Sequence, residues 1–255
     1  MKRYKNYIFD FYGTLVDIIT DENKLELWEK LAEIYHSFGC TYGARQLRSS
    51  FQEKASEAEL DLIRISPYEN VEIDLEKVFI QLLTDEKYRR PTKNEPADLK
   101  TFGQVVASIF RVLSREKLTT YANTLSTLAY LKDKGNHLYL LSNAQRVFTQ
   151  AEIEMTGCAE YIEGIYISSD YRIKKPEPEF LQGVLNENQL NPTETVLVGN
   201  DLTTDIAIAQ ELGIDAILLN TFPYSPEEIQ AYRDLGWKFE VIEDISELVS
   251  FHGQE

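Results

Sequence analysis

The sequence has little cysteine and no long apolar run, and each shortage excludes a class of protein. Its two cysteines, Cys40 and Cys158, are too few and too scattered for a disulfide framework or a zinc site. Every hydrophobic stretch is much shorter than the roughly 20 residues that a membrane-spanning helix needs. A reduced, cytoplasmic enzyme is therefore expected.

Basic residues are also scarce. The 26 lysines and arginines are outnumbered by 42 acidic residues, so the formal net charge is −16 at pH 7. Proteins that bind nucleic acid or anionic membranes carry basic surfaces, so this balance argues against both partners. It does not exclude a small anionic substrate, because a bound cation and a nearby lysine can reverse the field at one site.

The hydrophobic pattern divides the 255 residues into two parts. Residues 18–114 show apolar side chains at helical spacing and no convincing strand, which predicts an inserted, all-α cap domain. Its first helix is expected at 21–38, with Asp21 as N-cap and with Trp28 and Tyr35 as packing residues. Three more helices are expected at 44–65, 75–83 and 97–114.

Residues 1–17 and 115–255 alternate short apolar strands with helices. This order predicts an α/β core with a doubly wound, Rossmann-like parallel sheet. The strands are expected at 7–9, 137–141, 162–167, 195–198, 216–219 and 239–242. The helices are expected at 125–135, 147–155, 180–186, 206–212 and 225–235. We expect the cap to cover the C-terminal edge of this sheet as a lid.

The first strand leads directly into candidate chemistry. An apolar run ends at Asp10 and is followed by Gly13 and Thr14, which predicts a buried strand entering a tight turn. A carboxylate at the C-terminal end of a parallel strand lies where open α/β sheets bind ligands. Alone, however, Asp10 is equally compatible with a simple turn cap.

Polar groups follow three other segments of the predicted core: Ser142 and Asn143, the turn with Lys174 and Lys175, and the acids Asp201 and Asp205. The ends of parallel strands converge on one edge, so these groups are expected to meet Asp10 there. Mg²⁺ prefers carboxylate oxygens and would offset the repulsion between several acids. The combination predicts a site for a phosphate group and a metal ion.

The ordered motifs at 10–15, 138–143, 175–178 and 196–205 together resemble those of the haloacid dehalogenase superfamily of hydrolases. The matching branch carries a helical cap inserted after the first core strand. The resemblance implies that Asp10 is a nucleophile forming a covalent aspartyl intermediate. It further implies substrate contacts from Thr14, Ser142, Asn143 and Lys175, with Lys174 as an alternative to Lys175.

The same resemblance implies a Mg²⁺ site. Asp10, the backbone carbonyl of Tyr12 and Asp201 are the expected ligands, and Asp205 is expected to be a ligand or to orient the others. Asn200 departs from the family pattern, because many phosphatases of the family have an aspartate there. A neutral amide at this position predicts weaker metal binding.

Tyr12 is the main departure from the family pattern. Most phosphatases of the family have an acid there that protonates the leaving group, whereas tyrosine has an ordinary pKa of about 10. Dehalogenases of the family do carry tyrosine, which raises metal-independent attack of Asp10 on a 2-haloacid as an alternative. Leu181, where those dehalogenases have tyrosine, and the retained Asp201 favour the phosphatase.

We therefore predict Mg²⁺-dependent hydrolysis of a phosphorylated metabolite through Asp10, with Tyr12, Ser142 and Lys175 at the catalytic centre. Dehalogenation is the second hypothesis. A weak or inactive protein that binds a phosphometabolite is the third. The cap is expected to set specificity. Its candidate anion contacts are Arg45, Arg48, Arg64, Arg89 and Arg90.

Overall fold

The computed structural model describes residues 3–250; the ends of the predicted core, 1–2 and 251–255, lie outside the described residues. Within this range a six-stranded parallel sheet has the order β5-β4-β1-β6-β7-β8. Its strands are β1 (Asn6–Phe9), β4 (His137–Ser142), β5 (Gly164–Ile167), β6 (Thr195–Gly199), β7 (Asp215–Leu219) and β8 (Glu240–Ile242). The predicted parallel sheet and α/β class are confirmed.

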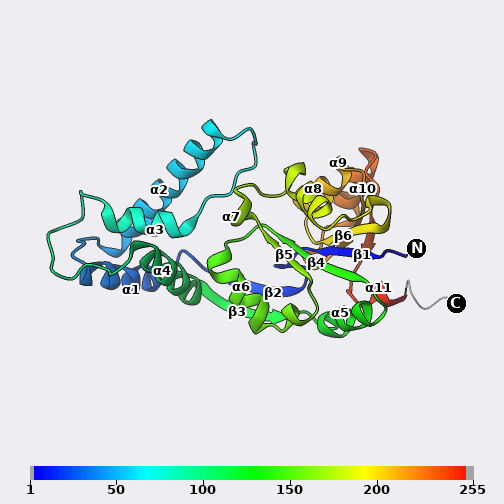
Figure 1. Ribbon diagram of the computed structural model, residues 1–255, viewed down its shortest axis with the longest axis horizontal. Helices are drawn as coiled ribbons and strands as arrows, with labels where there is room; N and C mark the ends of the chain where they lie inside the picture. Colours follow the sequence, from blue (N-terminus) through cyan, green and yellow to red (C-terminus); the bar gives the residue numbers. More distant parts are fainter. Residues whose placement is uncertain (1–2, 251–255) are drawn as a thin grey trace.

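Both faces of the sheet are buried, as continuous apolar strands require. In β1, Tyr7 and Phe9 pack into one apolar cluster and Ile8 packs into another. Figure 1 shows helices above and below the sheet. The first cluster is covered by α5 (Thr124–Asp133), α6 (Arg146–Met155) and α11 (Glu247–Ser250). The second is covered by α8 (Pro178–Glu187), a π-helical turn η3 (Leu202–Ile206), α9 (Ala207–Glu211) and α10 (Pro226–Asp234).

Three short helical turns complete the sheet-containing part: η1 (Cys158–Glu160), α7 (Ser168–Tyr171) and η2 (Pro192–Glu194). The turn α7 follows the end of β5 directly and was not anticipated. Its four residues carry no helical periodicity that a sequence pattern could reveal.

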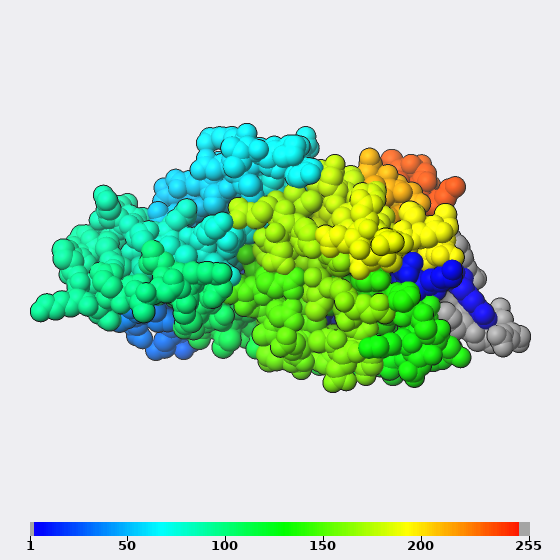
Figure 2. Space-filling view, in the orientation of Figure 1, coloured from blue at the N-terminus to red at the C-terminus, as the bar shows by residue number. Residues whose placement is uncertain are grey.

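Four helices lie between β1 and β4 in the chain and pack around an apolar cluster of their own. They are α1 (Leu25–Ser37), α2 (Ala44–Ile65), α3 (Leu75–Thr84) and α4 (Leu99–Ser114). Trp28 and Tyr35 are fully buried in that cluster, so their prediction as packing residues is confirmed. Figures 1 and 2 place these helices at one end of an elongated molecule. The cap boundaries near residues 17 and 114 stay a prediction.

An antiparallel ribbon of β2 (Val16–Thr20) and β3 (Arg115–Thr120) joins the two parts. The prediction that Asp21 caps the first helix was wrong: β2 continues to Thr20, and the helix begins at Leu25. The carboxylate of Asp21 instead accepts the backbone N–H of Asn23 at 2.8 Å. The ribbon has a weak sequence signal, because its strands pair across about a hundred intervening residues and β3 is largely exposed.

Candidate active site

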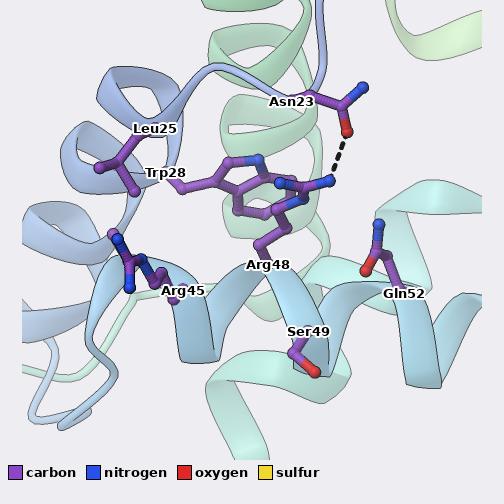
Figure 3. Close-up of a pocket in the computed structure, with 8 residues that line it drawn as sticks. Asn23, Leu25, Trp28, Arg45, Arg48, Ser49 and Gln52 are labelled. Atoms are coloured by element: carbon purple, nitrogen blue, oxygen red, sulfur yellow. Dashed lines mark hydrogen bonds between the residues drawn. The ribbon is translucent and has the colours of Figure 1, made fainter.

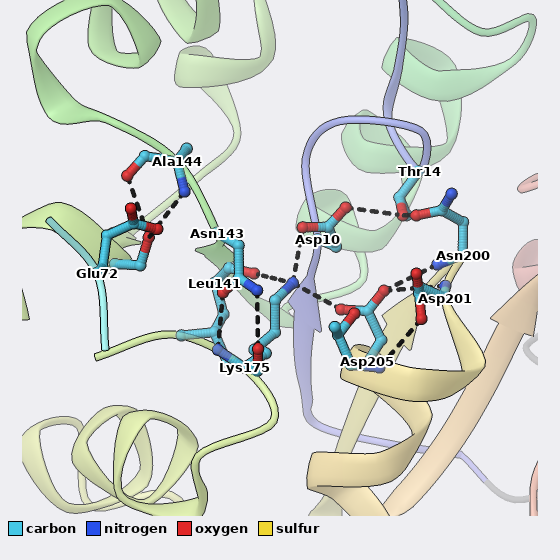
Figure 4. Close-up of polar contacts among 12 residues, drawn as sticks. Asp10, Thr14, Glu72, Leu141, Asn143, Ala144, Lys175, Asn200, Asp201 and Asp205 are labelled. Atoms are coloured by element: carbon cyan, nitrogen blue, oxygen red, sulfur yellow. Dashed lines mark hydrogen bonds and ion pairs between the residues drawn. The ribbon is translucent and has the colours of Figure 1, made fainter. Parts of the chain in front are cut away.

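The predicted residues from three separate segments meet at the C-terminal edge of the sheet (Figure 4). Asp10 follows β1, and its backbone N–H donates to Val198 of β6 at 2.9 Å. The ammonium of Lys175 donates to Asp10 Oδ1 at 2.7 Å, to Asp205 Oδ1 at 2.6 Å and to the carbonyl of Leu141 at 2.8 Å. Lys175 is only 3% exposed, so this is a buried ion cluster.

Burial and charge act against one another in this cluster. Burial alone would lower the pKa of Lys175, but the Asp10 and Asp205 carboxylates raise it above its ordinary value. Burial raises the pKa of Asp205, and the Lys175 ammonium opposes that rise. Asp205 Oδ2 also accepts the backbone N–H groups of Asn200 and Asp201, both at 3.1 Å. Both oxygens of Asp205 are therefore engaged by the protein.

The alternative lysine of the same turn lies elsewhere. Lys174 Nζ contacts Glu59 on α2 at 3.3 Å. Its side chain is about one-third exposed, unlike that of Lys175. The structure therefore brings Lys175, and not Lys174, to Asp10.

Glycine is required at the end of β6, within the motif at residues 196–205. A Cβ atom at Gly199 would lie 2.2 Å from Cγ of Asp205, far inside van der Waals contact. The carboxylate can lie against the end of β6 only because Gly199 has no side chain. Gly13 has a φ of +82°, and a Cβ there would approach Asn200 Nδ2 to 2.5 Å. The turn after Asp10 therefore packs closely against Asn200.

Two acceptor oxygens share one hydroxyl beside Asp10. Thr14 Oγ1 lies 3.3 Å from Asp10 Oδ2 and 3.2 Å from Asn200 Oδ1. A threonine hydroxyl has a single hydrogen, so it satisfies only one of them at a time. Asp201 points to η3 instead: its Oδ1 accepts the backbone N–H groups of Thr203 and Thr204 at 2.6 and 3.1 Å.

The oxygen atoms beside Asp10 offer possible ligands for a metal ion. Among residues 3–250, no group of three or more His, Cys, Asp or Glu side chains is arranged to hold a metal ion. Asp10 Oδ2 and Asn200 Oδ1 nevertheless face the same Thr14 hydroxyl, which can donate its one hydrogen to only one of them. Carboxylate and amide oxygens of this kind are ligands that Mg²⁺ prefers. The donor set fits a divalent cation with a neutral amide in place of a second carboxylate.

The end of β4 contributes two predicted residues. Ser142 is 2% exposed, and its hydroxyl has no hydrogen-bond partner within the described part of the chain. Buried polar groups rarely stay unpaired, so this hydroxyl is a candidate for a ligand contact. Asn143 behaves differently, because its side-chain amide binds the backbone of Lys175.

The hydroxyl of Tyr12 is engaged in hydrogen bonds within the protein. Its hydroxyl donates to Glu152 of α6 and lies 3.0 Å from Thr149 Oγ1. Burial raises the pKa of Tyr12 well above its ordinary value. Glu152 is in turn held by Arg111 of α4, with N–O distances of 2.8 and 3.0 Å, and by Arg115. Burial would raise the pKa of Glu152, but the bonds from Arg111 lower it.

The buried Arg111 and Glu152 were missed by the sequence analysis. The only signal was a small-residue stripe on α4, where Gly103, Ala107 and Arg111 are spaced four apart and are all buried. Small residues let α4 approach its neighbours closely, and a charged residue continuing such a stripe requires a buried partner.

A cavity of about 410 Å³ lies where the helical region meets the site. It is lined by Tyr12, Asn143 and Phe148 from the sheet-containing part, and by Glu22, Glu72 and Arg111 among others. It therefore adjoins both the turn after Asp10 and the end of β4. Burial raises the pKa of Glu22 and of Glu72.

A second pocket, of about 400 Å³, lies within the helical region (Figure 3). It contains Arg45 and Arg48, and Arg48 donates to Asn23 at 2.5 Å. None of its lining residues belongs to the cavity that Tyr12 and Asn143 line. Of the other candidate anion contacts, Arg64 pairs with Asp61 and Arg89 with Glu95, while Arg90 donates to backbone carbonyls.

A buried lysine between the carboxylate that follows β1 and a carboxylate on η3, at the edge of a parallel sheet, is an arrangement suited to an α/β hydrolase. The sequence profile of the haloacid dehalogenase-like hydrolases matches residues 4–213, and the chain belongs to that family. The predicted family and hydrolase class are thereby confirmed.

Characterised relatives include enzymes of both predicted types. A glyceraldehyde 3-phosphate phosphatase of Methanothermobacter thermautotrophicus is 30% identical over 131 residues, 51% of this chain and 58% of that protein. The (S)-2-haloacid dehalogenase 4A of Burkholderia cepacia is 26% identical over 118 residues, 46% of this chain and 51% of that protein. The chain spans about half the length of the curated relatives it matches.

Among solved structures, a 2-haloacid dehalogenase from Pseudomonas syringae pv. Tomato DC3000 has the same fold. The TM-score is 0.68 at 21% identity, and the match covers 98% of both chains. At this identity the likeness concerns the fold alone. Within residues 3–250, no helix combines the length and the apolar character needed to cross a bilayer.

The contact between Gly199 and Asp205 gives a stability test. We expect Gly199→Ala to lower the free energy of unfolding by about 1–3 kcal/mol, because its Cβ overlaps a buried carboxylate that cannot move freely. Gly183→Ala in α8 is the matched control, since nothing lies within 4 Å of its Cβ position and alanine stabilises a helix by about 1 kcal/mol. Urea unfolding of both variants measures the difference; equal effects would contradict the packing described here.

Proposed function

We propose that this protein hydrolyses phosphate monoesters through an aspartyl-phosphate intermediate on Asp10, with Mg²⁺ as the cofactor. The observation that carries this proposal is that Lys175 binds only one oxygen of Asp10, at 2.7 Å. The ammonium fixes the orientation of the carboxylate, so that one oxygen can face the phosphorus while the other faces the metal ion. The phosphatase of Methanothermobacter thermautotrophicus among its relatives supports the substrate class.

The proposed reaction has two displacements at phosphorus. In the first, a carboxylate oxygen of Asp10 attacks the phosphorus, and the bond to the leaving oxygen breaks; the leaving group takes the electron pair and then a proton from water. In the second, water attacks the aspartyl phosphate, and the bond between phosphorus and Asp10 breaks to release phosphate. Ser142 would donate its unpaired hydroxyl to the transferred group, with Thr14 and Lys175 as further contacts. Asn143 as a substrate contact stays a prediction.

The proposed metal ligands are Asp10, the backbone carbonyl of Tyr12 and Asn200 Oδ1, which shares the Thr14 hydroxyl with Asp10. Asp201 as a ligand stays a prediction, because its Oδ1 is bonded to the backbone of η3. When bound, Mg²⁺ would supply positive charge to the phosphoryl oxygens. We give Asp205 the orienting role that the sequence left open, because Lys175 and two backbone N–H groups occupy its oxygens. Both cysteines are buried and free, which supports a reducing, cytoplasmic location.

Asp10→Asn tests the nucleophile. An amide cannot form the acyl phosphate, so we expect phosphate release in the presence of Mg²⁺ to fall by at least about 10³-fold. A malachite-green assay over phosphorylated metabolites and p-nitrophenyl phosphate measures it. The exposed Asp61→Asn on α2 is the control and should retain activity. Activity in Asp10→Asn, or full activity of the natural chain in EDTA, would refute the nucleophile or the metal, respectively.

The environment of Tyr12 predicts a dependence on the leaving group. Because its hydroxyl is bonded to Glu152 and its pKa is raised, no acid at position 12 can protonate the leaving oxygen. A missing general acid typically costs about 10²–10⁴-fold, so we expect aryl phosphates to be hydrolysed faster than alkyl phosphates by such a factor. Comparing kcat/KM for p-nitrophenyl phosphate and glycerol phosphate measures this ratio; similar values would show that another group delivers the proton.

Dehalogenation is the second candidate, and the anchoring of Tyr12 favours it, since a halide leaves without a proton. In that reaction Asp10 Oδ2 would displace halide from the carbon of a 2-haloacid, and water would then hydrolyse the ester. Halide release from 2-chloropropionate in EDTA would support this candidate over the phosphatase. Release of neither halide nor phosphate would support the third hypothesis, binding without turnover.

A further inference from the structure

Asn143 makes an unusual pair of contacts with the catalytic lysine. Its Oδ1 accepts the backbone N–H of Lys175 at 2.7 Å, and its Nδ2 donates to the backbone carbonyl of Lys175 at 2.9 Å (Figure 4). One side-chain amide thus binds both hydrogen-bonding groups of a single residue's main chain. Asn143 directly follows Ser142, the last residue of β4, so it projects this amide from the rigid sheet.

The segment that carries Lys175 forms no helix or strand of its own, and its backbone bonds to residues 70–72 involve residues 172–174 and stop short of Lys175. It connects α7, which ends at Tyr171, to α8, which begins at Pro178. Because Asn143 takes both polar groups of the Lys175 main chain, this contact sets where the long lysine side chain starts. The ammonium at its far end reaches three acceptors within 2.8 Å, an arrangement that depends on a correctly placed backbone.

We propose that Asn143 is a positioning residue that holds the Lys175 backbone so that the ammonium reaches Asp10 and Asp205. The role of Lys175 in turnover rests on the proposed function, whereas its placement does not. This assignment differs from a substrate contact, because the oxygen and the nitrogen of the amide are both directed at Lys175. A substrate-binding residue would chiefly affect KM, whereas a residue that places Lys175 affects kcat and the accessibility of the ammonium.

The test compares three variants. Asn143→Ala removes both bonds to Lys175. Asn143→Asp keeps an acceptor for the Lys175 N–H but places a carboxylate oxygen where the amide donated to the Lys175 carbonyl, so it breaks one of the two bonds. Asn136→Ala is the matched control, because Asn136 is a buried asparagine that donates to a backbone carbonyl, that of Tyr4, at 2.7 Å. It lies just before the opposite end of β4, away from Asp10.

Two measurements are made on each folded protein. The first is kcat and KM with p-nitrophenyl phosphate and Mg²⁺. The second is the rate of acetylation of Lys175 by acetic anhydride, read by mass spectrometry relative to the exposed Lys134. The labelling is independent of turnover, so it reports on Lys175 even if no phosphate ester is a substrate.

For Asn143→Ala we expect kcat to fall by about 10- to 100-fold with little change in KM, as for a displaced catalytic group. Lys175 labelling should rise by at least about tenfold, because the displaced ammonium becomes accessible. Asn143→Asp should shift both quantities in the same directions, and Asn136→Ala should leave both unchanged. Unchanged labelling in both Asn143 variants, or a rise in KM alone, would overturn the proposal. Absence of phosphate release from the natural chain, with labelling as expected, would refute the proposed function and leave the positioning role standing.

Discussion

The site depends on one buried cation held between two buried carboxylates. Lys175 touches Asp10 and Asp205 at 2.7 and 2.6 Å, and all three side chains are more than nine-tenths buried. Without the ammonium, two like charges would face each other with little solvent, which is a costly arrangement. The cluster retains one excess negative charge. A site of this charge that is to receive a phosphate group requires further positive charge, and this supports the proposal of a divalent cation beside Asp10.

Much of this site was predictable because its residues follow buried strands. Asp10, Ser142 and Gly199 end or follow apolar runs, and parallel pairing aligns those ends: Phe9 lies opposite Leu140 on one side and Val198 on the other. A short apolar run that ends in a polar residue or glycine therefore suffices to place chemistry on one edge of the sheet. What it does not specify is which side chains bond across that edge. The engagement of both oxygens of Asp205, and of both ends of the Asn143 amide, left no trace in spacing or composition.

The connection between the sheet-containing part and the helical region was the part of the fold that the sequence predicted least well. The ribbon of β2 and β3 pairs residues about a hundred positions apart, and the exposed face of β3 weakens its alternation. The Arg111–Glu152 pair joins α4 to α6 and takes up the hydroxyl of Tyr12. Tyr12 therefore packs the turn after Asp10 against the contact between α4 and α6. Because the Tyr12 hydroxyl is bonded to Glu152, residue 12 cannot also donate a proton to a leaving group. The contact that connects the two parts of the molecule therefore excludes residue 12 as a general acid.

The turn after β4 links the ion cluster around Lys175 to the helical region. Asn143 binds the Lys175 backbone, and the next residue, Ala144, exchanges hydrogen bonds with the hydroxyl of Ser168. Gln145 is buried, and its amide bonds to the backbone of Ile73 and Leu75 in the helical region. Three consecutive residues thus hold the lysine, the end of β5 and the loop before α3. If that loop moved away, the buried amide of Gln145 would lose its hydrogen-bond partners, which is costly. Because Gln145 and Asn143 belong to the same turn, the position of the helical region and the geometry of the ion cluster depend on that one turn.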